Sequence, residues 1–140
     1  MKSYRDYQKP TAQDIADDHD ELVAEILLCA PRVIVLIGAW SVEHVLYRKP
    51  ELDKCHGVPI RVTELFGGEL EGEWIVLPMI HPASAAHSAD SLNLVFDDVQ
   101  SLGRLLDEEI SPVEDDVPES DLDYRMVKEK ELDAILRSVL

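Results

Sequence analysis

RVIVLIG, residues 32–38, is the stretch of sequence that decides the fold. It is a near-continuous run of β-branched and aliphatic residues, and it ends in Gly38. Strands that are buried on both faces of a parallel sheet have this composition. The segments on either side of it have apolar residues at helical spacing. Residues 12–48 are therefore predicted to form a helix–strand–helix unit, which is typical of the α/β class.

The helix before this strand has a clear start and a clear end. Thr11 can cap it, with Asp14 three residues later as the capping-box partner, and Pro31 ends it. His19 in this helix and His44 in the next are predicted to lie on helix surfaces. The apolar face of the first helix is formed by five residues at helical spacing: Ile15, Leu22, Val23, Ile26 and Leu27.

The turn after the strand is a candidate anion site. Gly38 turns the chain into a short helix over residues 41–49, which Ser41 can cap. The free N–H groups at a helix start bind anions, so Gly38 and Ser41 are candidate anion-binding residues. The alternative is a plain turn that binds only water.

The second half of the chain continues the α/β pattern. Residues 58–66 and 73–80 are predicted strands of a hairpin, because a glycine-containing loop joins them. Residues 89–109 form a long helix, residues 111–120 an acidic linker with prolines, and residues 121–140 a final amphipathic helix. We therefore expect one α/β unit over residues 1–110. The long helix carries an apolar stripe predicted to face inward: Leu92, Val95, Phe96, Val99, Leu102 and Leu106.

VLPMIHPASAAH, residues 76–87, places a histidine at the end of the second hairpin strand. Pro82 restricts the backbone of His81 to an extended geometry. An imidazole at the carboxyl end of a strand can donate a hydrogen bond to a developing anion, and Ser84 could hold a phosphate oxygen. The alternative is that His81 only caps the strand end. We expect the strand that ends at His81 to be parallel to the strand before Gly38, so that His81 lies beside the Gly38 turn.

The chain is strongly acidic, with 13 basic and 29 acidic residues and a net charge of −16. Such a surface repels phosphate backbones at low salt. Two explanations remain open: a salt-rich cytoplasm that screens the charge, or a basic partner that the chain binds as an acidic interaction protein. The acids are spread through the helices, which favours the salt-rich cytoplasm.

Several classes of protein are disfavoured. The polar N-terminus predicts a cytoplasmic protein without an export signal. Cys29 and Cys55 are too few for a disulfide framework, and Cys55-His56 has no second ligand pair. We therefore expect no metal and no cofactor.

The segments 10–46 and 76–87, with a hairpin between them, resemble the carboxyl half of the uracil-DNA glycosylase superfamily, in order and spacing across residues 9–106. The closest likeness is to its iron–sulfur-type branch, but Asp18 stands where that branch has a cluster cysteine. The resemblance implies a truncated three-layer glycosylase-like fold. Its small, mostly parallel sheet would contain a hairpin and be flanked by helices.

The resemblance also implies a chemistry. Members of this superfamily flip a damaged base out of DNA and break its N-glycosidic bond. The histidine of the His-Pro motif stabilises charge on the departing base, and that catalytic role falls on His81. The residues after it enter the DNA groove, which makes Pro82, Ser84 and His87 the expected DNA-binding residues, with His87 the only candidate wedge.

Two motifs of the superfamily have no counterpart in these 140 residues. The first contains a glycine-rich loop and the acidic or polar residue that positions the water, and the second contains the asparagine that reads the uracil edge. The resemblance therefore implies reduced or no activity for this chain alone. A homo-oligomer or a complementing chain is expected, because parallel sheet edges are rarely left bare. The open alternatives are a divergent glycosylase that recruits an aspartate near residue 97, and an acidic protein that sequesters a DNA-binding partner.

Overall fold

The computed structural model describes residues 11–115, which divide between two compact units. The first unit contains the helix α1 (Ala12–Cys29), and the second contains everything from Pro31 to residue 115. The predicted final helix at 121–140 lies outside the described residues. None of the helices in the described part of the chain is long and apolar enough to span a bilayer.

The helix α1 begins as its sequence predicts. The Thr11 side chain accepts a hydrogen bond from the Asp14 N–H, and the Asp14 carboxylate accepts one from the Thr11 N–H. The prediction for His19 was wrong, because its side chain is only 1% exposed. His19 lies three residues after Ala16 and seven before Ile26, so helical spacing puts it on their buried face. Ile15 and Leu27, predicted on the apolar face, are exposed.

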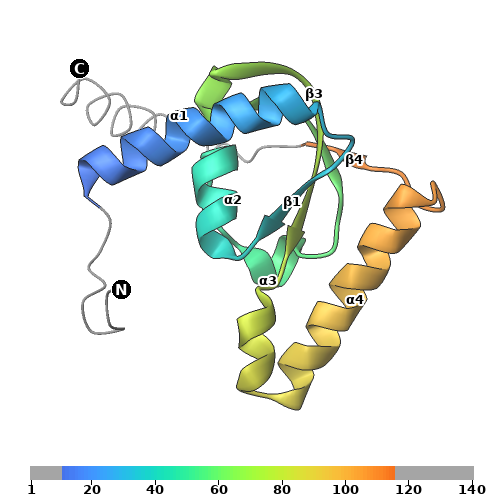
Figure 1. Ribbon diagram of the computed structural model, residues 1–140. Helices are drawn as coiled ribbons and strands as arrows, with labels where there is room; N and C mark the ends of the chain where they lie inside the picture. The colour runs from blue at the N-terminus through green and yellow to red at the C-terminus, as the bar shows by residue number, and fades with distance from the viewer. Residues whose placement is uncertain (1–10, 116–140) are drawn as a thin grey trace. The chain divides into compact units, whose positions relative to one another are not determined.

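The second unit is built on a four-stranded sheet, shown in Figure 1. The strands are β1 (Ile34–Ile37), β2 (Ile60–Leu65), β3 (Leu70–Met79) and β4 (Val113–Glu114), in the order β1-β3-β2-β4. Pairing is parallel for β1 with β3 and for β2 with β4, and antiparallel for β2 with β3. The mostly parallel sheet and the predicted hairpin are thus confirmed, although β3 begins within the predicted loop.

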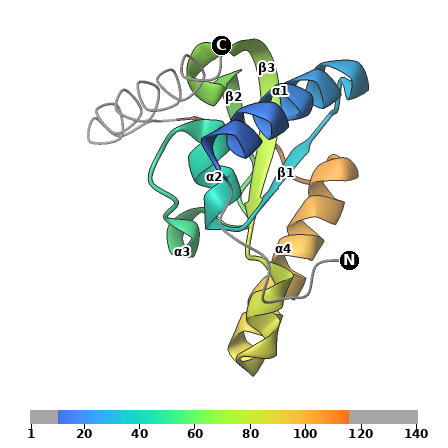
Figure 2. The ribbon, with the colours of Figure 1, turned by 60° about the vertical axis from the view of Figure 1, so that its left-hand side comes forward.

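The central strand β3 carries the core of the sheet. Val76 and Leu77 are fully buried, which requires cover on both faces of the strand. The helices α2 (Ala39–Leu46) and α4 (Ala89–Leu106) lie on either side of the sheet in Figures 1 and 2. The arrangement is the layered α/β fold that the sequence predicts. Short helical turns complete it: α3 (Leu52–Cys55), η2 (Phe66–Gly68) and η3 (Pro82–Ala86).

The helix α4 is rotated relative to its prediction. Asp98 and Leu105 are its buried residues, whereas Phe96 is 58% exposed and Val99 51% exposed. Leu92 and Leu106, the ends of the predicted inner stripe, are also exposed. The four exposed positions follow intervals of four, three and seven residues, so they form one continuous apolar surface, called here the α4 stripe.

The strand β4 lies inside the predicted acidic linker. Val113 pairs with Ile60 and Glu114 with Arg61, so this part of the chain belongs to the sheet. The next residue, Asp115, makes two hydrogen bonds of 2.7 and 2.6 Å with the Arg48 guanidinium just after α2. Both side chains are about 85% buried, at 15% and 16% exposure. The linker prediction missed this pairing because it depends on residues 67 positions apart.

We expect Asp115→Ala to lower the free energy of unfolding by about 2 kcal/mol, because it leaves the partly buried Arg48 guanidinium unpaired. The matched control is Glu114→Ala. Its carboxylate lies 3.5 Å from Arg61 and is 84% exposed, so its loss should cost less than about 0.5 kcal/mol. Urea denaturation of both variants measures the difference, and equal losses would show that the Arg48 pair adds no stability.

Candidate functional site

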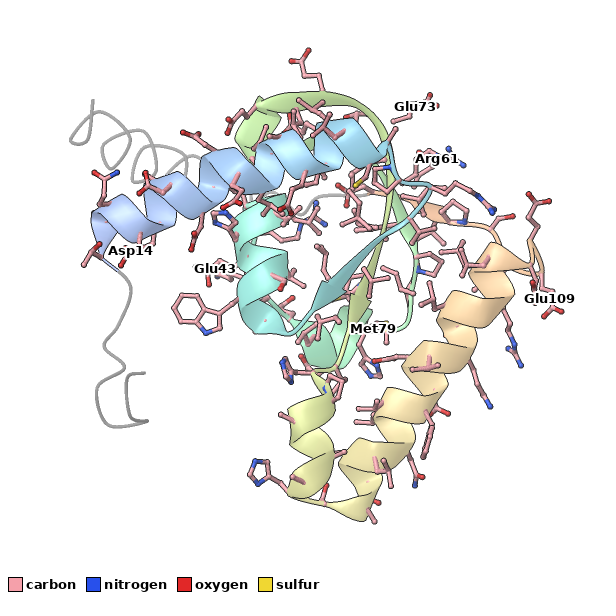
Figure 3. The ribbon with its side chains drawn as sticks, in the orientation of Figure 1. Asp14, Glu43, Arg61, Glu73, Met79 and Glu109 are labelled. Atoms are coloured by element: carbon pink, nitrogen blue, oxygen red, sulfur yellow. The ribbon has the colours of Figure 1, made fainter. Side chains whose placement is uncertain are left out.

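His81 lies directly beyond the carboxyl end of β3, whose last residue, Met79, is labelled in Figure 3. Its backbone is extended, with φ −66° and ψ 129°, as expected before Pro82. His81 is the N-cap of η3, and its ring nitrogen Nδ1 accepts a 3.0 Å hydrogen bond from the Ala83 N–H. His81 therefore does act as a cap, of the short helix η3 that follows the strand. The capping hydrogen bond uses only one of the two ring nitrogens, Nδ1.

The hydrogen bond to Nδ1 fixes which tautomer the neutral ring adopts. A nitrogen that accepts cannot carry the proton, so the neutral imidazole of His81 holds its proton on Nε2. The residue is exposed, and Nε2 has no hydrogen-bond partner among residues 11–115. The cap thus leaves an Nε2–H donor free for a ligand.

Gly38 lies beside this ring. The strands β1 and β3 are parallel, with Ile37 paired to Met79, so both end at the same edge of the sheet. The Gly38 N–H donates a 3.0 Å hydrogen bond to the Met79 carbonyl. A Cβ on Gly38 would lie 3.6 Å from His81 Cδ2, and the φ of +88° disfavours any other residue. The predicted juxtaposition of Gly38 and His81 is confirmed.

Ser41 does not cap α2. The helix begins two residues earlier than predicted, with Gly38 as the N-cap and no side-chain cap. The Ser41 hydroxyl instead donates a 2.9 Å hydrogen bond to the Ile37 carbonyl at the end of β1. The predicted cap at Ser41 was wrong, because Ser41 is only the first residue in this segment with a capping side chain, whereas the helix begins at the Gly38 backbone. Anion binding at Gly38 and Ser41 stays a prediction.

The other predicted DNA-binding residues lie on the same short turn as His81. The Ser84 N–H donates to the His81 carbonyl at 2.9 Å, and the Ser84 carbonyl accepts from the His87 N–H at 3.1 Å. Pro82 and His87 are exposed, and Ser84 is half-buried. These bonds make η3 a compact unit that carries all four residues. Their contact with DNA stays a prediction.

A buried hydrogen-bonded pair, Asp98 and His56, supports this site, and the sequence pattern contains no clear signal for it. Asp98 on α4 is 1% exposed, and its Oδ1 lies 2.7 Å from His56 Nδ1. Its Oδ2 accepts a 2.8 Å hydrogen bond from the Ile80 N–H, next to His81. The available hint was Asp98, the second of two adjacent aspartates in α4, which the sequence pattern does not distinguish from a surface residue.

Half of the lysines and arginines between residues 11 and 115 line one cavity. This cavity, of about 150 Å³, lies between α2, α3 and the sheet, and its basic lining residues are Arg48, Lys49 and Lys54. Burial raises the pKa of the Cys55 thiol in the same cavity, so this cysteine is a poor nucleophile. Within the described part of the chain, no cluster of three metal-ligating side chains is present.

The family model of the uracil DNA glycosylase superfamily matches residues 1–100. No curated protein matches the sequence significantly. The matched region covers most of the chain and includes β1, the hairpin, His81 and most of α4. The chain therefore belongs to the uracil-DNA glycosylase superfamily.

Proposed function

We propose that this chain is a DNA-repair protein of the uracil-DNA glycosylase type that supplies the His81 end of a base-excision site. The observation that carries the proposal is the free Nε2–H of His81 beside Gly38. Cleavage of an N-glycosidic bond leaves negative charge on the departing base, and a fixed N–H donor stabilises that charge. Pro82, Ser84 and His87 on η3 would contact the DNA strand.

The distribution of charge supports DNA binding despite the net charge of −16. Lys49 and Lys54 line the cavity at α3. The loop after α3 contacts the carboxyl end of β3, because His56 in that loop contacts Asp98, which accepts a hydrogen bond from the Ile80 N–H. Phosphate contacts from lysines supply most of the affinity of non-specific DNA binding. Pro78, three residues before His81, lines the same cavity, so a strand held at Lys49 and Lys54 would lie near the carboxyl end of β3.

We propose further that the chain alone has little or no turnover and acts with a second copy or a complementing chain. The water-positioning and base-reading motifs of the superfamily are not among its 140 residues. Two surfaces support a partner: β1 is an edge strand of the sheet, and the α4 stripe is exposed. Exposed apolar patches of this kind mark protein interfaces.

Fluorescence anisotropy with single-stranded oligonucleotides that carry one uracil or one tetrahydrofuran abasic analogue, which lacks the base, tests the proposal. We expect binding at 0.1 M KCl with a preference for uracil, which His81→Ala reduces about tenfold, the effect of one lost hydrogen bond. Lys49→Ala/Lys54→Ala should lower the salt slope by about 1.4, or about 0.7 for each phosphate contact. Arg104→Ala, on the exposed surface of α4, is the matched charge control.

The outcomes separate the parts of the proposal. Failure to bind DNA at 0.1 M KCl would exclude a repair function, and a uracil preference that survives His81→Ala would remove His81 from the site. We expect no uracil release above the His81→Ala background at 0.1 or 1 M KCl. Faster release would show an active divergent enzyme, whose His81→Ala variant should then be slower by about 10²–10³. Light scattering of the same samples reports self-association.

The second candidate function is an acidic protein that sequesters a DNA-binding partner. The observation in its favour is the α4 stripe on a chain of net charge −16, which suits an apolar partner with basic flanks. This candidate requires no affinity for DNA and no effect of Lys49 or Lys54. The anisotropy experiment therefore decides between the two.

A further inference from the structure

Asp98 is a charged group in a place where charge is costly. Its side chain is 1% exposed, and an unpaired carboxylate there would be strongly destabilising. Both oxygens are used: Oδ1 contacts His56 Nδ1 at 2.7 Å, and Oδ2 accepts from the Ile80 N–H at 2.8 Å. The carboxylate thus joins α4, the loop after α3 and the carboxyl end of β3.

The Ile80 N–H belongs to the Met79–Ile80 peptide group, which lies one peptide group before the bond that joins Ile80 to His81. The pairing of β3 with β1 ends at Met79, so the sheet ladder offers Ile80 no acceptor. The carbonyl of the same peptide group, that of Met79, accepts the Gly38 N–H at 3.0 Å. A peptide group is planar, so the two bonds on opposite sides fix its orientation. Gly38 holds one side of this plane and Asp98 holds the other.

His56 and Gly57 fix the carboxylate in turn. The Gly57 N–H donates a 2.8 Å hydrogen bond to the Pro78 carbonyl, which places the loop against β3. A Cβ on Gly57 would lie 2.7 Å from Asp98 Oδ1, so the loop backbone packs directly against the carboxylate. The His56 ring, half-buried beside it, then holds Oδ1 and leaves Oδ2 aimed at Ile80.

We propose that Asp98, oriented by His56, is a positioning residue that sets the His81 ring at the carboxyl end of β3. This inference rests on the proposed role of His81. Asp98 is too deeply buried to touch DNA or a base. It acts by fixing the Met79–Ile80 peptide plane, from which the chain continues through Ile80 to the His81 backbone. The position of the His81 ring and its hydrogen bond with the Ala83 N–H depend on this anchor.

The test is nuclear magnetic resonance of the His81 ring nitrogens, together with the uracil preference in DNA binding. Asp98→Leu fills the volume without an acceptor, and Asp98→Ala removes the side chain. In either variant we expect the Nδ1 and Nε2 signals of His81 to move towards those of a mixed tautomer, and the uracil preference to fall about tenfold. Asp98→Asn keeps an oxygen for Ile80 and should retain both properties.

The controls separate positioning from folding. Far-UV circular dichroism must match the wild type before a variant is compared. If Asp98→Leu and Asp98→Ala both unfold, His56→Ala decides, because it removes only the group that orients Oδ1. Unchanged His81 ring signals in a folded acceptor-free variant, or in His56→Ala when that variant decides, would overturn the proposal. So would equal loss in Asp98→Asn.

The same measurements distinguish this inference from the proposed function. If the wild type shows no uracil preference that depends on His81, the proposed role of His81 in base excision is wrong. The ring signals still report whether Asp98 sets the tautomer and position of His81. If the preference depends on His81 but not on Asp98, only the positioning role fails.

Discussion

Gly57→Ala is expected to lower the free energy of unfolding by about 3 kcal/mol. The backbone at Gly57 has φ +75°, a left-handed conformation that costs a residue with a Cβ about 1 kcal/mol. The new Cβ would also lie 2.7 Å from Asp98 Oδ1. That carboxylate is 1% exposed and bonded to His56 and Ile80, so it cannot move aside without losing a charged hydrogen bond worth about 2 kcal/mol.

The matched control is Gly103→Ala, the same chemical change inside the helix α4. A Cβ at Gly103 would meet nothing within 4 Å. Because glycine in a helix interior is less stable than alanine, this variant should gain about 0.5–1 kcal/mol. Urea denaturation followed by circular dichroism measures both. A neutral Gly57→Ala would mean that the loop carrying His56 can rearrange freely, which would also weaken the positioning role of Asp98.

The parts of the fold that the sequence predicted correctly are those with a local cause. The capping box of Thr11 and Asp14 acts within one helical turn. The β-branched run before Gly38 does form a parallel strand, and the apolar run before His81 must end where Pro82 restricts the backbone. The expected burial of the first strand on both faces was wrong, because β1 lies at an edge of the sheet and Ile37 is 43% exposed. Two strand ends of this kind, each on a parallel strand, necessarily meet at one edge of the sheet. The juxtaposition of Gly38 and His81 followed from that.

The parts that the sequence did not predict depend on contacts between distant residues. His56 and Asp98 are 42 residues apart, and each looks ordinary in its own segment. The pairing of β4 with β2 and the bond between Arg48 and Asp115 likewise join segments that carry no mutual signal. The start of α2 at Gly38 was missed because backbone geometry, and not a capping side chain, begins that helix.

The orientation of the helix α4 could not be predicted from the spacing of its apolar residues. Apolar residues at helical spacing predict an amphipathic helix, and the residues 89–106 do form one. The same pattern does not say which face packs against the sheet, because a second apolar position can lie on the other side of the helix. In the structure, Leu105 is 5% exposed and the adjacent Leu106 is 44% exposed. Leu106 belongs to the stripe that was predicted to face inward.

These two leucines give a direct test of the rotation of α4. We expect Leu105→Ala to lower the free energy of unfolding by about 3 kcal/mol, because it removes a buried side chain and leaves a cavity. Leu106→Ala should cost less than about 1 kcal/mol, since a side chain that is already half exposed loses little burial.

The two variants share their chemistry, their helix and nearly their position, so propensity and unfolded-state effects largely cancel in the comparison. Urea denaturation of the isolated chain measures the difference. The opposite order, with Leu106→Ala the more damaging, would mean that the α4 stripe packs inward. The exposed apolar surface proposed to receive a partner would then not exist. An equal, large loss in both would mean that α4 is covered on two sides, as in a chain that already self-associates through the stripe.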